Sequence, residues 1–300
     1  MKNFRDVTGI LLFDKPLGLS SNQALQKVRR LFRARKAGHT GSLDPLATGL
    51  LPVCFGEATK IAGYLLGARK AYTAQCKLGV TTTTGDAEGE IIAARAVPVL
   101  DDTVIESALA KFRGRIVQIP PAYSAIKQGG VPLYKRVRQG ENVEVPPREV
   151  DVYAFDCHGR DGDMLTLHVE CGSGTYVRSL ARDLGEALGC GAHLTALRRE
   201  WVEPFRQPAM HTLAELEQAA VDESVLDSLL LPLEAGLQGM PRVALTTDEA
   251  RRLHHGQAVR VEHACAAERA YATGPGGEAI ALVAVDPVGE VRVLRGLHSL

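Results

Sequence analysis

The sequence predicts an α+β protein with one large domain and a small β-rich domain at its C-terminal end. The chain has 300 residues, of which 45% are hydrophobic and 23% charged, so it can bury a sizeable core. Segments with strand-like alternation are interspersed with segments of helical spacing. A glycine- and proline-containing stretch at residues 236–241 precedes about sixty residues in which strand-like runs dominate.

The N-terminal segment is predicted to run from a buried strand into a capped helix. Residues 10–13 are all apolar, and Asp14, Lys15 and Pro16 follow them as a turn. Ser20 and Gln23 have the spacing of a capping box, and apolar residues then recur at helical spacing up to residue 32. The helix is expected to end before the glycine-rich segment that begins at residue 38.

The other elements are predicted from strand-like alternation or helical spacing of apolar residues. Strands are expected at residues 50–55, 72–78, 150–156 and 164–170, and helices at residues 57–66, 102–112 and 179–188. Residues 81–89 are predicted to form a polar loop, and the proline- and glycine-rich stretch after residue 112 a long surface excursion. Beyond residue 241, a short helix at 247–255 precedes strands at 279–285 and 290–294.

Several classes of protein are disfavoured. No apolar run has the length of a transmembrane helix, and the N-terminus lacks the apolar core of a secretion signal, so we expect a cytoplasmic protein. The six cysteines contain no C-x-x-C pair, and the nine histidines show no metal-ligand spacing. Neither a disulfide framework nor a metal site is therefore expected.

Charge is distributed unevenly although the formal net charge is zero. Residues 1–80 hold 13 Lys and Arg against 4 Asp and Glu, and residues 111–138 hold seven basic residues and no acid. Residues 211–234 hold six acids and no Lys or Arg. This segregation favours a basic side that faces a polyanion and an acidic side that faces solvent, although charge runs are equally typical of ordinary solvated faces.

Asp44 is the most conspicuous candidate for chemistry. It precedes Pro45, which restricts its backbone, and the small residues around it would let a bulky ligand approach. An Asp-Pro pair is also a common helix start, with Asp as the N-cap, and the dipeptide alone favours that explanation. A second candidate is the segment GSGTYVR at residues 172–178, whose amides could hold an anion between a strand and a helix.

The segment GHTGSLDPLATGLLP at residues 38–52 resembles the catalytic motif of the tRNA pseudouridine synthase B family. Further matching segments follow in the order of that family. They are DKP at 14–16, GEATK at 56–60, KAY at 70–72, IPPAYSA at 119–125, GTYVR at 174–178, GCGAHL at 189–194 and LRR at 197–199. The resemblance covers the whole chain and is weakest beyond residue 240.

The resemblance implies a pseudouridine synthase core with a mixed, largely antiparallel β-sheet flanked by helices. This catalytic domain would span residues 1–240, with an RNA-gripping insertion at about 113–148. Residues 241–300 would form a small PUA-like RNA-binding domain. The threonine-rich loop at residues 81–86 departs from the usual family sequence.

The family implies isomerisation of uridine-55 in the T-loop of tRNA to pseudouridine, on a flipped-out base and without a cofactor. The reaction breaks the N1–C1′ bond, turns the uracil and joins C5 to C1′, which needs no oxidant, metal or ATP. Asp44 matches the catalytic aspartate, and attack on the base, attack on the sugar and removal of a sugar proton all remain open as its role. Arg178 matches the partner that keeps this carboxylate ionised.

The same resemblance assigns residues that would contact the substrate. Tyr72 matches the aromatic ring that stacks on the uracil, and His39 matches the residue that fills the gap left by the flipped nucleotide. The matched substrate-binding residues are His39, Tyr72, Tyr176, Arg178, Leu197, Lys15 and Lys60. By pattern alone, the tyrosines and Leu197 would be core residues and the lysines surface residues.

The partner implied is tRNA, recognised through its T-arm by a monomer with no metal and no membrane attachment. Four basic residues of the insertion are expected to contact the RNA backbone, namely Lys127, Lys135, Arg136 and Arg138. Two alternatives stay open. One is a guide-RNA-dependent relative with the same core, and the other is a mainly non-catalytic tRNA-folding chaperone, for which the basic N-terminal third would suffice.

Overall fold

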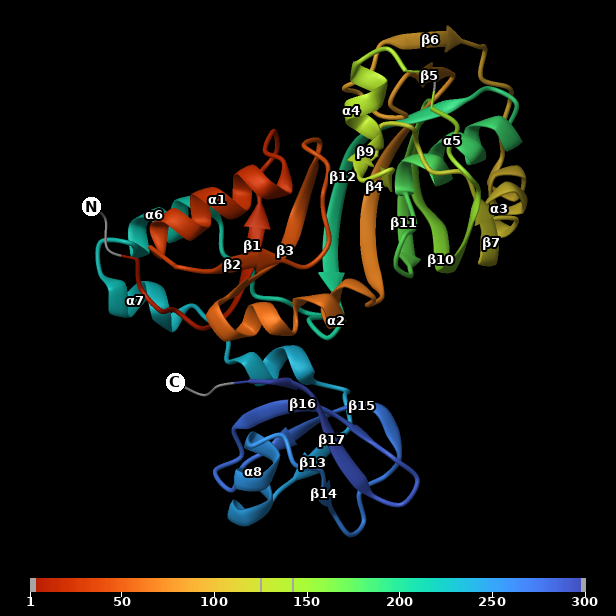
Figure 1. The fold of residues 1–300 in the computed structure, drawn as a ribbon. Coiled ribbons are helices and arrows are strands. Elements are labelled where there is room, and N and C mark those ends of the chain that lie inside the picture. The colour runs from red at the N-terminus through yellow and green to blue at the C-terminus, as the bar shows by residue number, and fades with distance from the viewer. Residues whose placement is uncertain (1–3, 125, 142, 298–300) are drawn as a thin grey trace.

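The computed structural model describes residues 4–124, 126–141 and 143–297. Ala125, the last residue of one of the segments quoted above, therefore lies outside the described residues. Figure 1 shows a large body built on a long sheet and a smaller β-rich body that ends the chain. None of the described helices is long and apolar enough to cross a membrane.

The main sheet carries the larger body. Its strands are β1 (Gly9–Lys15), β2 (Ala37–His39), β3 (Ala47–Phe55), β4 (Lys70–Leu78), β7 (Gly114–Gln118), β10 (Arg148–Asp161), β11 (Met164–Cys171) and β12 (Ala192–Val202). They are ordered β1-β3-β12-β4-β11-β10-β7, with β2 paired to β3. Only the β3–β12 pair is parallel among these pairs, which confirms the expected mixed, largely antiparallel sheet.

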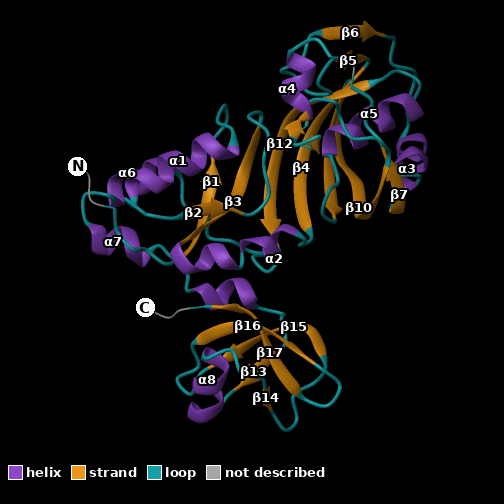
Figure 2. Cartoon of the chain, in the orientation of Figure 1, coloured by secondary structure: helices purple, strands orange, loops and turns teal. Residues whose placement is uncertain are grey.

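Helices and short turns cover the sheet, as the colouring in Figure 2 makes clear. They are α1 (Ser21–Leu31), η1 (Gly56–Lys60), α2 (Ala62–Leu66), α3 (Asp102–Ala110), α5 (Val177–Ala187), α6 (Leu213–Ala219) and α7 (Glu223–Ser228). The predicted capping box is present: Ser20 caps α1, and Gln23 bonds back to it. The single helix expected at residues 57–66 is instead the 3₁₀ turn η1 followed by the short α2.

Two irregular segments leave the sheet near the candidate motifs. The expected polar loop at 81–89 is bounded by a small hairpin, β5 (Val80–Thr82) with β6 (Ile91–Ala94). The expected insertion begins with β7, which belongs to the main sheet, so its irregular part runs between β7 and β10. Within it lie β8 (Lys127–Gln128), β9 (Val131–Pro132) and α4 (Leu133–Arg138).

The C-terminal body is a separate five-stranded sheet, which confirms the small β-rich domain. Its elements are β13 (Arg242–Ala244), α8 (Thr247–His254), β14 (Val259–Arg260), β15 (Ala267–Thr273), β16 (Ala279–Val285) and β17 (Glu290–Gly296). Leu282 and Leu297 share an apolar cluster with Ile61, Leu65 and Leu237 of the larger body. This cluster, with the turn η2 (Leu233–Leu237), docks the small domain against α2.

Candidate active site

Asp44 lies on a tight turn between β2 and β3. The amide of Ala47 donates to the Asp44 carbonyl at 3.0 Å, and β3 begins there, so no helix follows Pro45. The buried Ser21 of α1 anchors the loop, because its hydroxyl accepts from the Leu43 amide at 2.7 Å and donates to the Leu43 carbonyl at 3.0 Å. The helix-cap explanation of the Asp-Pro pair is therefore wrong, and the loop holds the carboxylate in place.

Arg178, in the first turn of α5, is the partner of Asp44. Its Nη2 lies 2.9 Å from the Asp44 Oδ2, and its side chain is only 6% exposed. The same guanidinium donates to the carbonyls of Thr84 and Tyr123, both at 2.9 Å. One buried side chain thus joins the Asp44 loop, the β5–β6 loop and the start of the irregular insertion.

Asp86 is a second carboxylate at this guanidinium, and the sequence analysis did not select it. Its Oδ2 lies 3.5 Å from the Arg178 Nη1, and its Oδ1 accepts from the Thr84 hydroxyl at 2.5 Å and the Glu88 amide at 3.1 Å. The hydroxyl of Thr82 donates to the Asp86 carbonyl at 2.6 Å. The threonine-rich loop therefore builds the turn that buries Asp86, which gives that unusual composition a structural function.

The electrostatics of Asp44 reflect these opposed neighbours. Burial raises the pKa of its carboxyl group, Arg178 opposes that rise, and the negative charge of Asp86 adds to it. The Asp44 side chain nevertheless keeps 42% of its surface open. It is crowded by protein on one side and accessible to a ligand on the other, as a group that must react with a bound molecule requires.

Lys15 lies beneath this loop at the end of β1. It is fully buried, and its ammonium group donates to the carbonyls of Pro16 at 2.9 Å and Leu19 at 2.5 Å. Burial lowers the pKa of Lys15 to about 8, while the charge of Asp44 opposes that shift. The structure therefore brings Lys15 near Asp44 without an ion pair and ties it to the turn that leads into α1.

Tyr72 and Leu197 lie on the adjacent strands β4 and β12. Both are buried within the main apolar cluster, so the core interpretation describes their packing. Burial raises the pKa of the Tyr72 phenol, with Arg199 opposing the rise and Asp44 adding to it. Tyr72 is the cross-strand partner of Arg199, and Leu197 is two residues from Arg199 on the same strand.

Tyr176 is positioned by a residue that the sequence analysis missed. Gln118, buried at the end of β7, accepts from the Tyr176 amide at 2.8 Å and donates to the Tyr176 carbonyl at 3.1 Å. The ring is half-buried, and the Arg148 guanidinium lies 6.0 Å from its centroid. Burial raises the pKa of the Tyr176 phenol, and the charge of Asp44 adds to that rise, so this ring also lies near the carboxylate.

His39 ends β2, five residues before Asp44. Its Nδ1 is buried and has no hydrogen-bond partner among the residues that the structure describes. Burial lowers the pKa of this imidazole, and the charge of Arg199 lowers it further. Both effects favour the neutral ring, and its unsatisfied nitrogen suits a side chain that rearranges when a ligand arrives.

Lys60 does not join this cluster. Its ammonium group lies 2.5 Å from the Glu57 carboxylate and donates to the Gly296 carbonyl at 2.9 Å. Gly296 is the last residue of β17, so Lys60 connects η1 to the C-terminal domain. A contact with a flipped nucleotide would require it to leave both partners.

The basic residues of the insertion differ in their exposure and in the contacts that their charged groups make within the protein. Lys127, Lys135 and Arg138 are exposed, with the Arg138 guanidinium 5.7 Å from the centroid of the Tyr134 ring. Arg136 is held inside the insertion, 2.7 Å from Glu141 and 2.9 Å from the Gln128 side-chain oxygen. The first three are therefore better placed than Arg136 to meet an external polyanion.

The expected separation of basic and acidic sides holds only in part. Arg5 lies 2.9 Å from Asp227 and 3.2 Å from Glu223, and Arg33 also pairs with Glu223. These acids belong to α7, within the acidic stretch that was expected to face solvent. Part of the N-terminal basic excess is therefore paired with half-exposed acids of the same chain, because α7 follows α6, which packs beside α1.

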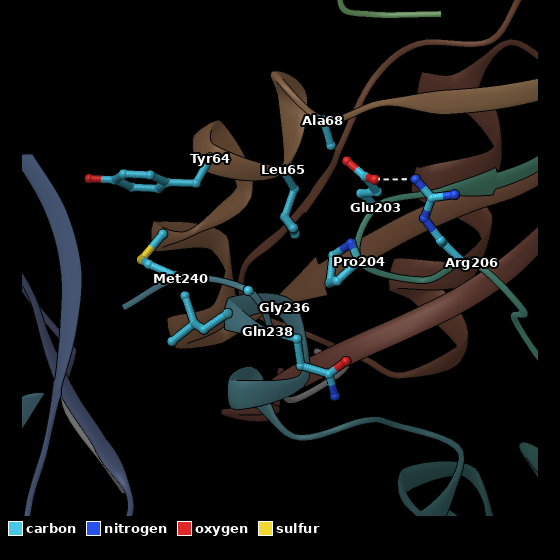
Figure 3. A pocket seen from close by; sticks show the side chains of 11 residues that line it. Tyr64, Leu65, Ala68, Glu203, Pro204, Arg206, Gly236, Gln238 and Met240 are labelled. Atoms are coloured by element: carbon cyan, nitrogen blue, oxygen red, sulfur yellow. Dashed lines mark hydrogen bonds and ion pairs between the residues drawn. The ribbon is translucent and has the colours of Figure 1, made fainter. Parts of the chain in front are cut away.

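A cavity lies at the domain junction (Figure 3). Its walls come from α2, from the segment after β12 and from the connection to the small domain. They include Tyr64, Leu65, Glu203, Arg206 and residues 236–240, and Arg206 pairs with Glu203 at 2.5 Å. None of the residues selected from the sequence lines it. Within the described ranges, no three His, Cys, Asp or Glu side chains gather as metal ligands.

Comparison with known proteins gives consistent matches over the whole chain. Family models described as the TruB family pseudouridylate synthase N-terminal domain and the tRNA pseudouridylate synthase B C-terminal domain match residues 29–177 and 178–238. A relative from Xanthomonas euvesicatoria pv. vesicatoria named tRNA pseudouridine synthase B is 55% identical, with 99% of this chain and 97% of the relative covered. A relative of the same name from Dechloromonas aromatica is 53% identical, with 90% of each chain covered.

Solved structures match the fold at lower identity. The crystal structure of a Cbf5-Nop10-Gar1 complex contains a chain with a TM-score of 0.76 and 24% identity, covering 97% of this chain and 85% of that one. An H/ACA RNP bound to a substrate RNA containing 2′-deoxyuridine contains a chain with a TM-score of 0.75 and 21% identity, covering 99% and 92%. These likenesses establish that the chains share an architecture.

Proposed function

Because the chain belongs to the TruB family of pseudouridylate synthases, we propose that it isomerises uridine-55 in the T-loop of tRNA to pseudouridine. The name shared by the relatives, tRNA pseudouridine synthase B, supports tRNA as the substrate. The observation that carries the proposal is the accessible Asp44 carboxylate held 2.9 Å from the buried Arg178. A fixed, ionised carboxylate is the one reactive group that this rearrangement requires of the protein.

In the proposed reaction, Asp44 acts as the carboxylate anion and Arg178 holds it in one orientation. The N1–C1′ bond breaks and its electron pair goes to the uracil. The ring turns, C5 forms a bond to C1′, the proton leaves C5, and N1 ends protonated, so the reaction is balanced without a co-reactant. Asp44 assists by attacking the base or the sugar or by removing a sugar proton, and its position is compatible with each of these roles.

The target base must leave the RNA stack to reach this carboxylate, at a cost of a few kcal/mol. Tyr72, Tyr176 and Leu197 are proposed to receive it, because the two tyrosines are close enough to Asp44 for its charge to affect their pKa values. His39, whose buried Nδ1 is unsatisfied, is proposed to take the vacated place in the stack. Lys15 is proposed to support the site by fixing the turn between β1 and α1.

The exposed basic residues of the insertion are proposed to bind the T-arm of the tRNA. Lys127, Lys135 and Arg138 of the insertion would contact phosphates, and Arg136 would stiffen the insertion through Glu141 and Gln128. We assign the catalytic domain to residues 1–240 and the PUA-like RNA-binding domain to residues 241–300. The protein is proposed to act as a monomer in the cytoplasm, without a metal ion.

The test is incubation of the protein with an unmodified tRNA transcript, followed by carbodiimide mapping of pseudouridine. Modification confined to position 55, and lost when that uridine is replaced by cytidine, is the expected result. Modification that requires an added guide RNA would instead identify a guide-dependent enzyme. Tight tRNA binding with no pseudouridine at any position would identify an RNA-folding chaperone.

A further inference from the structure

Two buried cations, Lys70 and Arg199, lie side by side under the Asp44 loop. Lys70 begins β4 and is 7% exposed, and Arg199 on β12 is 1% exposed. A Cβ atom placed on Gly41 would lie 3.4 Å from the Arg199 Nη1 and 3.7 Å from the Lys70 Cε. Both side chains therefore approach the backbone of the loop three residues before Asp44.

Both cations are held by neutral oxygens. The Lys70 ammonium donates to the carbonyls of Leu66 at 3.1 Å and Ala68 at 2.6 Å. The Arg199 guanidinium donates from Nε to the Leu50 carbonyl at 2.7 Å and from Nη2 to the Gly41 carbonyl at 3.2 Å. Within the described part of the chain, no carboxylate lies within 4.0 Å of the charged nitrogens of either residue.

This arrangement differs from that of the other cation of the site. Arg178 is shared by two carboxylates, Asp44 and Asp86. Lys70 and Arg199 instead repel each other, and burial together with Arg199 lowers the pKa of Lys70 to about 8, while Cys171 and Glu203 oppose that shift without an ion pair to Lys70. Burying two charges without a counter-ion is costly, and apolar side chains would fill the same space at lower cost. The missing negative charge therefore points to a ligand.

The position of Lys70 and Arg199 indicates which part of the substrate would carry this negative charge. Arg199 on β12 is the cross-strand partner of Tyr72 on β4, the residue proposed to receive the uracil. Its charge also lowers the pKa of His39, which lies two residues before Gly41. Building on the proposed function, we infer that Lys70 and Arg199 provide a fixed positive potential that stabilises the negative charge acquired by the uracil ring during the reaction. Such preorganised charges act most strongly in a site that excludes water.

In each of the three possible roles of Asp44, the uracil ring becomes negatively charged during the isomerisation. When the N1–C1′ bond breaks, its electron pair stays on the uracil, whose N1 and O2 carry the charge until C5 bonds to C1′. If Asp44 instead attacks the base, the same ring carries an enolate. The charge is transient, so a permanent carboxylate beside Lys70 and Arg199 would cancel the potential that stabilises it.

The experiment compares Lys70→Met with Lys77→Met, a control on the same strand whose side chain is half-exposed. Single-turnover loss of the target nucleoside is measured on tRNA carrying uridine or 5-fluorouridine, whose fluorine makes the base a more stable anion. Lys70→Met is expected to lower the rate on uridine by about 10- to 100-fold, because one preorganised group is lost. The loss on 5-fluorouridine is expected to be several-fold smaller, and Lys77→Met should change neither rate.

A second pair of variants separates charge from packing. Arg199→Lys keeps the positive charge and should retain much more activity than Arg199→Met, when both have melting temperatures near that of the parent chain. Equal losses on the two substrates, or an unchanged rate in Lys70→Met, would overturn the inference. Weaker tRNA binding at an unchanged rate would show that the pair holds a phosphate instead. If the parent chain forms no pseudouridine at all, the proposed function fails first, which keeps the two failures distinct.

Discussion

Arg178 is the residue through which three separate segments are brought to Asp44. Its guanidinium contacts Asp44, the Thr84 carbonyl and the Tyr123 carbonyl at 2.9 Å each. Its Nε is buried and has no partner among the described residues, so these contacts are made by the two Nη groups alone. A lysine ammonium group at this place cannot reproduce the planar fork that serves these acceptors.

Arg178→Lys is therefore expected to lower the isomerisation rate by about 100-fold or more, because small displacements of a reacting group are costly. Arg182→Lys, one turn later on α5, is the matched control and should keep nearly full activity. Single-turnover pseudouridine formation measures both. A rate within a few-fold of the parent for Arg178→Lys would contradict its role in orienting Asp44.

Asp86 is expected to affect the reaction by raising the pKa of Asp44. Burial and Asp86 together raise the pKa of Asp44, so the active carboxylate is lost as the pH falls through that raised value. Asp86→Asn removes one of the two causes. The acid limb of its rate profile should therefore lie at lower pH than that of the parent chain, even if its maximum rate is lower.

The control for this profile is Asp6→Asn, a surface carboxylate 3.3 Å from Arg35 and 59% exposed, which should leave the limb in place. Single-turnover rates between about pH 4 and 7 cover the ordinary range of a carboxyl group. An acid limb that does not move in Asp86→Asn would mean that another group controls it.

At the scale of elements, the insertion between β7 and β10 offers the clearest test of RNA contact. Lys127→Gln, Lys135→Gln and Arg138→Gln together remove three exposed charges. If each neutralises one phosphate, the slope of log binding constant against log salt should flatten by about two to three. Filter binding to tRNA over a salt series measures this slope.

Arg136→Gln serves as the contrast, because its guanidinium is bonded to Glu141 and Gln128. It should alter the salt dependence less than any of the three exposed residues. A slope that stays unchanged in the triple variant, with its fold intact, would mean that the insertion is an ordinary solvated loop.

Elements with regular periodicity were predictable from the sequence. In β4, the buried residues Tyr72, Ala74 and Cys76 alternate with more exposed ones. Ser20 and Gln23 have the sequence spacing of the capping box that begins α1. The central strand β12 was missed. Its alternation is broken by register shifts after Leu194 and Arg199, and it buries Arg199, a charged residue that would be expected to face solvent.

The site itself was less predictable. The Asp44 loop was recognised from its family resemblance, whereas composition alone favoured a helix cap. Asp86, Gln118 and Arg199 were not selected as site residues, although Arg199 ends the matching LRR segment, because each acts on a group far away in the sequence. The 94-residue separation of Arg178 from the Thr84 carbonyl is typical of these contacts. Only the folded sheet brings such residues together.

At the scale of the molecule, Lys60 provides a polar contact between the two domains beside their shared apolar cluster. It bonds to Gly296 of the small domain and pairs with Glu57 of η1. Lys60→Met should lower the free energy of unfolding by about 1–2 kcal/mol, since a charged hydrogen bond is lost. Denaturant unfolding measures this loss, and protease sensitivity near residues 236–241 should increase with it.

The same variant separates the structural position of Lys60 from its family-based role. If the domain contact is its main function, isomerisation of an isolated T-arm hairpin should be almost unchanged. A stable Lys60→Met protein that binds the hairpin poorly would show instead that Lys60 leaves Gly296 to contact the RNA.

The central claim, that Asp44 drives the rearrangement of a tRNA uridine, is tested most directly by tritium release from tRNA labelled at C5 of its uridines. The parent chain should release one tritium per tRNA. Asp44→Asn, which removes the charge and almost no volume, should release it about 10⁴-fold more slowly while binding tRNA with the same affinity. Release at a rate near that of the parent chain, in a protein shown to carry asparagine at position 44, would contradict the account.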